Sequence, residues 1–318
     1  MTANDPREHA RRAARDAPSD ALAWIVLAEA ELDTGDAHAG EQAARRALTL
    51  APGHPEALAR LGRAQSMLGR RDDAVASLQA ALRAAPRHPG IAVWLGHALE
   101  DAGQAEAASD AYARAHALAP HEPQIAAYLL AWRRKLCDWR DLDALSAQVR
   151  DSVRRGQASI EPFAFLSEDS TPAEQLQCAR LRARMLAAVQ ALPDRANDKS
   201  RQAAAVAGAA SPIATLRVGF LSNGFGAHPT GLLTVALFEA LAKRTDIAVH
   251  LFALNADDGS AIGQRLRAAA HSLHDVAQQP HRAIAQRIRV AGIDVLFDLR
   301  GWGGGGTPEV LAMRPAPL

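Results

Sequence analysis

Apolar side chains in the first part of the chain recur at the three- and four-residue spacing of a helix face. In the segment ALAWIVLAEAELDTG, the residues Trp24, Leu27, Ala28 and Leu32 fall on one side of a helix. The segment that follows, DAHAGEQAARRALTLAPGHP, is predicted to form a second helix and its exit. The hydrophobic pattern therefore predicts a pair of helices joined by a short turn.

This helix pair repeats with a period of 34 residues. The period appears in prolines, glycines, leucines and alanines: Pro18, Pro52, Pro86, Pro120; Gly35, Gly69, Gly103; Leu27, Leu61, Leu95; Ala47, Ala81, Ala115. Each glycine is expected to end a first helix, since a residue with positive φ closes the turn cheaply. Such a pattern is that of the tetratricopeptide repeat, whose stacked helix pairs form a superhelix with a binding surface. Three units are predicted over residues 20–121, and a further first helix from Gln124 to about Leu136.

A different pattern follows the repeats. An amphipathic helix is predicted at 137–156, followed from Glu161 by a loop and then by a capped helix that begins near Ser170. The polar, small residues 193–212 are predicted to be a flexible linker or a surface loop. After Pro212, short apolar strands alternate with helices: strands at 216–222, 248–254, 273–276 and 293–301, and helices at 230–244, 259–270 and 280–292. This alternation predicts a parallel sheet with right-handed crossovers, a Rossmann-like half-domain.

Composition narrows the class of protein. The 36 lysines and arginines nearly balance 35 acidic residues, so no bulk field favours nucleic acid or a membrane surface as a partner. The N-terminus lacks the apolar segment of a signal peptide, and no apolar run approaches the ~18 residues that span a bilayer. Cys137 and Cys178 are expected to be reduced thiols of a cytoplasmic protein. The histidines His271, His274 and His281 lack metal-ligand spacing and are interpreted as surface or capping residues.

Two glycine-rich loops, SNGFGAHPTG at 222–231 and RGWGGGG at 300–306, follow the first and last predicted strands. The carboxyl ends of parallel strands share one sheet edge, where ligands of such folds bind. His228 precedes Pro229 at a helix start, so it is either an N-cap or a group that acts on substrate as a base or hydrogen-bond partner. The glycines 303–306 are either a loose turn or a place where backbone N–H groups approach a ligand. Neither loop has the dinucleotide-binding G-x-G-x-x-G spacing.

The order of motifs along this chain resembles that of the protein O-GlcNAc transferases, in particular of their bacterial homologues. The repeats lead to Cys137-Asp138-Trp139, then to LRVGFLSNGFGAHPTG (216–231), FDLRGWGGGG (297–306) and MRPAPL (313–318). The resemblance covers essentially the whole chain. It implies a two-lobed GT-B glycosyltransferase of family 41 that transfers N-acetylglucosamine from UDP-GlcNAc to Ser or Thr hydroxyls with inversion. This chain would hold the tetratricopeptide superhelix and an α/β Rossmann-like lobe, the first half of the GT-B fold.

The resemblance also implies which residues act. His228 matches the active-site histidine of the first lobe. The residues expected to bind substrate are Pro229, Thr230, Gly231, Arg300, Gly301, Trp302, Gly303 and Gly304. No metal or other cofactor is implied; UDP-GlcNAc is the donor substrate, and polypeptide acceptors would lie along the repeat groove. Thr307 stands where the family often has an arginine, and no lysine follows Lys243 to serve a diphosphate.

Three regions are expected: a superhelix at 1–137, connecting helices and a linker at 138–211, and the first catalytic lobe at 212–318. The expected function is a cytoplasmic protein O-GlcNAc transferase whose donor-binding lobe is absent from this chain, so that the chain alone would be inactive. The alternatives are a non-catalytic, peptide-binding adaptor with a Rossmann-like scaffold and a GT-B enzyme with another sugar donor. The sequence leaves open the acceptor proteins, the oligomeric state and whether His228 is a base or positions substrate.

Overall fold

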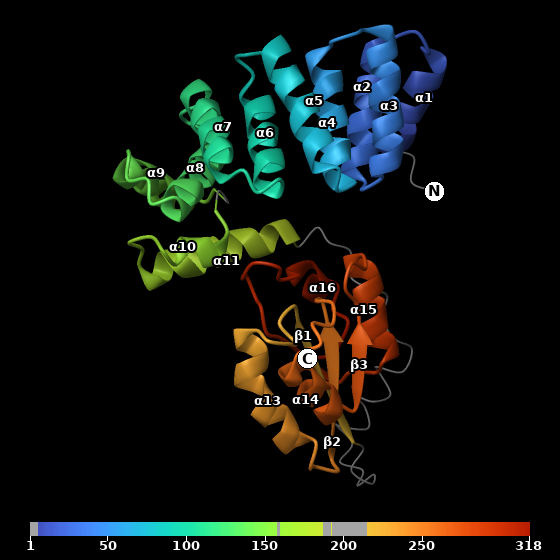
Figure 1. Cartoon of the computed structure of the whole chain (residues 1–318), viewed down its shortest axis with the longest axis vertical. Helices are drawn as coiled ribbons and strands as arrows, with labels where there is room; N and C mark the ends of the chain where they lie inside the picture. The colour runs from blue at the N-terminus through green and yellow to red at the C-terminus, as the bar shows by residue number, and fades with distance from the viewer. Residues whose placement is uncertain (1–5, 158–159, 187–191, 193–214) are drawn as a thin grey trace. The chain divides into compact units, whose positions relative to one another are not determined.

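A computed structural model of the chain describes residues 6–157, 160–186, Leu192 and 215–318 (Figure 1). The chain divides into two compact units, residues 1–160 with 164–178 and residues 161–163 with 179–318. The predicted fold class is confirmed, because the first unit is a helical superhelix and the second contains a small parallel sheet covered by helices. The predicted linker at 193–212 lies outside the described residues. Within the described part, no helix is long and apolar enough to cross a membrane.

The superhelix has the helix pairs that the 34-residue period predicts. Its helices are α1 (Pro6–Asp16), α2 (Ala21–Asp33), α3 (Ala37–Leu50), α4 (Pro55–Met67), α5 (Arg71–Ala84), α6 (Pro89–Asp101), α7 (Ala105–Leu118) and α8 (Pro123–Lys135). Gly35, Gly69 and Gly103 have φ values of 86°, 73° and 72°, so glycine closes each turn in the left-handed region as expected. The prolines at the starts of α4, α6 and α8 fit because the first helical N–H groups have no partner inside the helix.

Within each repeat, a small residue of the first helix faces a residue of the second helix. A Cβ on Gly62 would lie 2.6 Å from Leu78 Cγ, and a Cβ on Gly96 would lie 2.5 Å from Tyr112 Cε1. One repeat earlier, the same positions hold Ala28 and Ala44, which are completely buried in one cluster. The side-chain size on one helix is thus matched to that on the other, which keeps the helices close together.

Three helices follow the repeats: α9 (Leu142–Arg154), α10 (Pro162–Phe165) and α11 (Pro172–Leu186). Helix α9 begins five residues later than the predicted helix at 137–156, because Cys137 and Asp141 take the left-handed conformation, with φ of 53° and 48°. Arg133 holds the intervening turn by donating a hydrogen bond to the carbonyl of Arg140. Helix α10 lies in a stretch for which the sequence predicts a loop.

The sheet of the second unit is parallel throughout, with strand order β3-β2-β1-β4. The elements are β1 (Leu216–Ser222), α13 (Pro229–Leu241), β2 (Ile247–Ala253), α14 (Ala261–Ala269), β3 (Ser272–Asp275), α15 (His281–Val290), β4 (Val295–Asp298) and α16 (Pro308–Ala312). The predicted strands and helices are all present, although β4 is shorter than the predicted strand at 293–301. Helix α16 has no counterpart in the prediction.

Alternate side chains of the strands build one core on each face of the sheet. Val218 and Phe220 of β1 pack in a cluster that also contains Phe238 of α13. Leu221 of β1 joins the opposite cluster with Ile284 of α15. Helices α13 and α15 accordingly lie on opposite sides of the sheet (Figure 1). With both faces covered, the open part of this lobe is the edge where the strands end.

Candidate active site

The strand order changes direction between β1 and β4. From β1 the chain passes through α13 and α14 to β2 and β3 on one side, whereas β4 lies against the other side of β1. A reversal of this kind leaves a crevice beyond the carboxyl ends of the two strands, and ligands of doubly wound sheets bind there. The loops at 222–231 and 300–306 follow these two strands. The structure therefore brings the two predicted loops to the same switch point.

One side chain joins the two loops directly. The Nδ2 of Asn223 donates a hydrogen bond to the carbonyl oxygen of Gly304 at 3.3 Å. Gly305 allows this approach, because a Cβ on it would lie only 2.1 Å from that nitrogen, and its φ of 74° is in the left-handed region. The contact joins residues that are 81 positions apart in the chain.

Hydrogen bonds within the glycine-rich turn close it on itself. The N–H of Gly303 donates to the carbonyl of Arg300 at 2.8 Å, and the N–H of Gly306 donates to Gly303 at 2.9 Å. The guanidinium of Arg300 donates to the carbonyl of Gly304, and its backbone N–H donates to Asp298 Oδ1 at 2.9 Å. Arg300 therefore closes its own turn with one end of its guanidinium. Trp302, within the same turn, is partly buried.

His228 is the N-cap of α13, as one of the two interpretations of the sequence predicts. Its backbone is extended, with φ −126° and ψ 151°, and its Nδ1 accepts a hydrogen bond from the N–H of Thr230 at 3.1 Å. An imidazole nitrogen that accepts a hydrogen bond carries no proton, so in the neutral ring the proton lies on Nε2. The hydrogen-bond pattern thus assigns His228 as a donor at Nε2.

The other predicted residues of this loop form the first turn of α13. Pro229 is exposed, Thr230 is partly buried and Gly231 is buried. A Cβ on Gly231 would lie 2.2 Å from the carbonyl oxygen of Gly226, so glycine is needed there for the loop to fold back on the helix. The backbone N–H of Thr230 donates a hydrogen bond to His228, and the missing side chain of Gly231 leaves room for the carbonyl of Gly226.

Residues that follow β2 hold this loop in place. Asn255 accepts from the N–H of Phe225 and donates to its carbonyl, each at 3.1 Å, and Asp258 accepts from the N–H of Ala227 at 2.6 Å. Hydrogen bonds from Ser260 and Ala227 lower the pKa of Asp258 to about 2, which keeps it a charged acceptor. Sequence reasoning missed both side chains. The signal available was the polar run Asn255-Ala256-Asp257-Asp258-Gly259 directly after a strand.

Three polar atoms of the two loops and of the start of α16 are buried without a hydrogen-bond partner among the described residues. They are Asn223 Oδ1, Arg300 Nε and Thr307 Oγ1. Buried polar groups are nearly always paired with protein, water or ligand. An acceptor, a guanidinium N–H and a hydroxyl from the two loops and the start of α16 therefore offer polar groups to a ligand or to water at the switch point.

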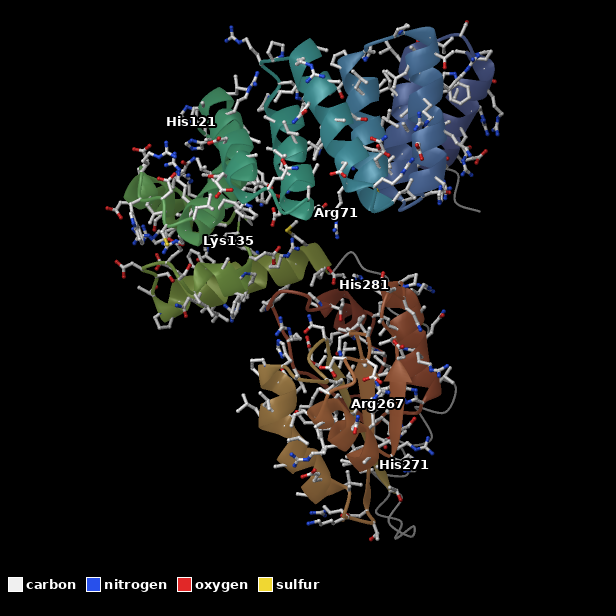
Figure 2. All side chains as sticks on the ribbon, in the orientation of Figure 1. Arg71, His121, Lys135, Arg267, His271 and His281 are labelled. Carbon is white, nitrogen blue, oxygen red and sulfur yellow. The ribbon has the colours of Figure 1, made fainter. Side chains whose placement is uncertain are left out.

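In the part of the chain that the structure describes, His271, His274 and His281 do not come together as a metal site. His271 and His281 are exposed and lie toward opposite ends of the α/β lobe (Figure 2). His274 stacks on Phe252 with ring centroids 4.5 Å apart. In the described parts of the chain, no group of three or more His, Cys, Asp and Glu side chains is placed to hold a metal ion.

Comparisons with known proteins match two separate parts of the chain to two family models. Residues 180–318 match the family model Glycosyl transferase family 41, and residues 31–87 match the model Tetratricopeptide repeat. A "Probable UDP-N-acetylglucosamine--peptide N-acetylglucosaminyltransferase SEC" of Arabidopsis thaliana is 28% identical over 191 residues, which are 58% of this chain and 19% of that protein. A UDP-N-acetylglucosamine--peptide N-acetylglucosaminyltransferase of Caenorhabditis elegans is 32% identical over 104 residues, which are 32% of this chain and 9% of that protein.

Solved structures include similar chains. A Thermobaculum terrenum O-GlcNAc transferase mutant is 24% identical, with a TM-score of 0.42, and the match covers 96% of this chain and 50% of that chain. A thermophilic tetratricopeptide repeat protein of Thermus thermophilus is 19% identical with a TM-score of 0.41, over 57% of this chain and 89% of that chain. This chain thus spans half or less of the transferases that it matches.

Proposed function

We propose that this chain, whose residues 180–318 match the model of glycosyl transferase family 41, is part of a protein O-GlcNAc transferase of the cytoplasm. In this proposal, the Ser or Thr hydroxyl of a polypeptide attacks the anomeric carbon of UDP-GlcNAc with inversion. The bond from that carbon to the diphosphate breaks, UDP leaves, and the hydroxyl proton passes to the departing diphosphate or to water. The observation that carries the proposal is the switch point between β1 and β4, where the predicted loops meet through Asn223 and Gly304. The repeats would hold the polypeptide acceptor, as stacked helix pairs bind extended chains on their surface.

In the proposed reaction, His228 orients substrate through a hydrogen bond donated by Nε2. Because its Nδ1 accepts the N–H of Thr230, the proton of the neutral ring lies on Nε2, so Nε2 can donate a hydrogen bond but cannot take a proton from a hydroxyl. Moving the proton to Nδ1 would place two donors against each other at the start of α13. A donor role keeps the cap intact and lets the ring bind an oxygen of the acceptor or the donor sugar.

The unpartnered polar atoms of the two loops and of the start of α16 would bind the remaining substrate oxygens. Arg300 Nε and Thr307 Oγ1 can donate to hydroxyl or phosphate oxygens, and Asn223 Oδ1 can accept from a sugar hydroxyl. Hydrogen bonds of this type stabilise charge that develops as the diphosphate departs. No metal ion is required in this proposal.

The test is transfer of radiolabelled N-acetylglucosamine from UDP-GlcNAc to a polypeptide, measured with the natural protein that contains this chain. In His228→Asn, the asparagine side chain can still cap α13, because Asn is a favoured N-cap, but the Nε2 donor is lost. We expect kcat to fall about 10²- to 10³-fold, the usual effect of losing one donor aimed at the reacting oxygens. His281→Asn, the same change at an exposed histidine of α15, should leave kcat unchanged.

Each outcome decides between the candidate functions. A wild-type rate in His228→Asn, with unchanged thermal unfolding, would contradict the role of His228. Incorporation from another UDP-sugar but not from UDP-GlcNAc would replace the donor. Binding of peptides to the repeats without transfer from any sugar nucleotide would show that the protein is an adaptor.

A further inference from the structure

A groove of about 770 Å³ opens at the first repeat of the superhelix. Pro6 and Ala10 of α1, Val26 and Glu29 of α2, and Arg60 of α4 line it. Val26 is 57% exposed, although it is an aliphatic residue in the middle of a regular helix. An open, largely apolar groove at this position indicates a place where another element packs.

The repeat itself shows what fills the equivalent groove one unit further along. Gly40 and Arg63 stand 34 residues after Pro6 and Glu29, and α2 packs against both. Leu32 of α2 covers Gly40, where a Cβ would lie 2.7 Å from Leu32 Cγ, and Glu29 of α2 pairs with Arg63 at 2.6 Å. The groove at the first repeat therefore continues an interface that the chain already forms, and its natural occupant is a helix like α2.

The residues of the groove specify that helix more closely. In α2 the eighth, ninth and twelfth residues, Ala28, Glu29 and Leu32, make these contacts. The groove has Pro6 in the place of Gly40, so the twelfth residue of its occupant must be smaller than leucine. It has Val26 in the place of Arg60 and Glu29 in the place of Arg63, the two partners of Glu29. Because the Glu29 of the groove is already paired with both arginines, the ninth residue should be apolar. The eighth faces Ala10, and the residues at this position in the three full repeats, Ala28, Gly62 and Gly96, are small.

Helix α13 meets each of these conditions on its exposed face. It has 13 residues, as α2 and α4 have, and it begins with a proline after a histidine, as α4 and α6 do. Its eighth, ninth and twelfth residues are Ala236, Leu237 and Ala240, and all three are exposed. Leu233, at the fifth position, is 82% exposed, whereas the fifth residue of α2 is the buried Ile25.

We propose that α13 of a second copy of this chain binds in the groove, with Ala236 and Ala240 against Ala10 and Pro6, and Leu237 against Val26. The contact joins different surfaces of the two copies, so it is heterologous. Each copy keeps one unused surface after the first contact. Association therefore continues beyond a dimer as concentration rises, unless the arrangement closes into a ring.

Sedimentation of the full chain over a range of concentrations tests this association. We expect the wild-type chain to self-associate and Val26→Glu or Leu233→Glu to lower the association constant at least tenfold, because each places a charge in an apolar contact. Val290→Glu is the matched control, since Val290 is 84% exposed on α15 and lies outside both surfaces. Far-UV circular dichroism of each variant shows that the helices are retained.

A mixing experiment separates this contact from any other mode of association. The Val26→Glu chain keeps its α13 face and the Leu233→Glu chain keeps its groove, so an equimolar mixture should form a one-to-one complex that neither forms alone. A wild-type chain that stays monomeric up to its solubility limit overturns the proposal. So does a mixture without a complex, or association of the Val26→Glu chain equal to that of wild type.

Discussion

The match of side-chain size between Gly62 and Leu78 predicts how the second repeat responds to substitution. In Gly62→Ala, the new Cβ would lie 2.6 Å from Leu78 Cγ, closer than side chains pack. Overpacking costs about 1–3 kcal/mol, and the better helix propensity of alanine offsets about 1 kcal/mol. We therefore expect Gly62→Ala to lower the free energy of unfolding by about 1 kcal/mol. Leu78 is 1% exposed, so Leu78→Ala should cost about 2–5 kcal/mol.

The double variant is the informative one. With Leu78 shortened to alanine, the methyl of Ala at position 62 has room and fills part of the cavity, as in the first repeat, where Ala28 and Ala44 occupy these positions. We expect the double variant to be more stable than the sum of the single effects by about 1–2 kcal/mol, within the usual range for residues in contact. Urea unfolding followed by circular dichroism measures all four proteins.

A pair of substitutions at distant sites serves as the control for this coupling energy. Leu130 is also 1% exposed but lies two repeats further along, so the effects of Gly62→Ala and Leu130→Ala should add to within about 0.5 kcal/mol. Additive effects of Gly62→Ala and Leu78→Ala would refute the argument, because they would show that the two side chains do not compete for the same space.

Three further predictions concern the α/β lobe, all measured by thermal unfolding. The pKa of Asp258 falls from 3.8 to about 2 on folding, so the Tm difference between wild type and Asp258→Ala should be full above pH ~4 and vanish as the pH falls to about 2. Burial lowers the pKa of His250 from 6.5 to about 4 beside His274, so wild type should lose stability as the pH falls through that window, and His250→Gln should lose less. A parallel pH profile for the two proteins would contradict this. Gly305→Ala should be destabilising by about 1 kcal/mol or more, because of its positive φ and its approach to Asn223, whereas Gly304→Ala, with open space around its Cβ, should stay within about 0.5 kcal/mol; equal effects would show that the contact with Asn223 is not required.

The helices, turns and strands could be predicted because each depends on residues that are close together in the sequence. The 34-residue period comes from residues that recur at the same place in each helix pair. Because each pair packs only on its neighbours, the repeat pattern is enough to predict how the pairs stack. The strand β1 and the helix start at Pro229 are likewise set by a short apolar run and by proline chemistry. The predicted helix at 137–156 was wrong at its start, because Cys137 and Asp141 take the left-handed conformation, which is uncommon for residues other than glycine.

The sequence by itself determined the repeats, the strand and helix order of the lobe, and the two loops from which a site would be built. The tertiary structure decided that β4 lies beside β1, because a parallel sheet of four strands admits several orders that local sequence does not distinguish. That choice joins Asn223 to Gly304, and the anchoring of the first loop by Asn255 and Asp258 also crosses between elements. Which nitrogen of His228 carries the proton depends on one backbone N–H that only the folded helix aims at the ring. These features depend on contacts between distant residues, so they exist only once the chain has folded.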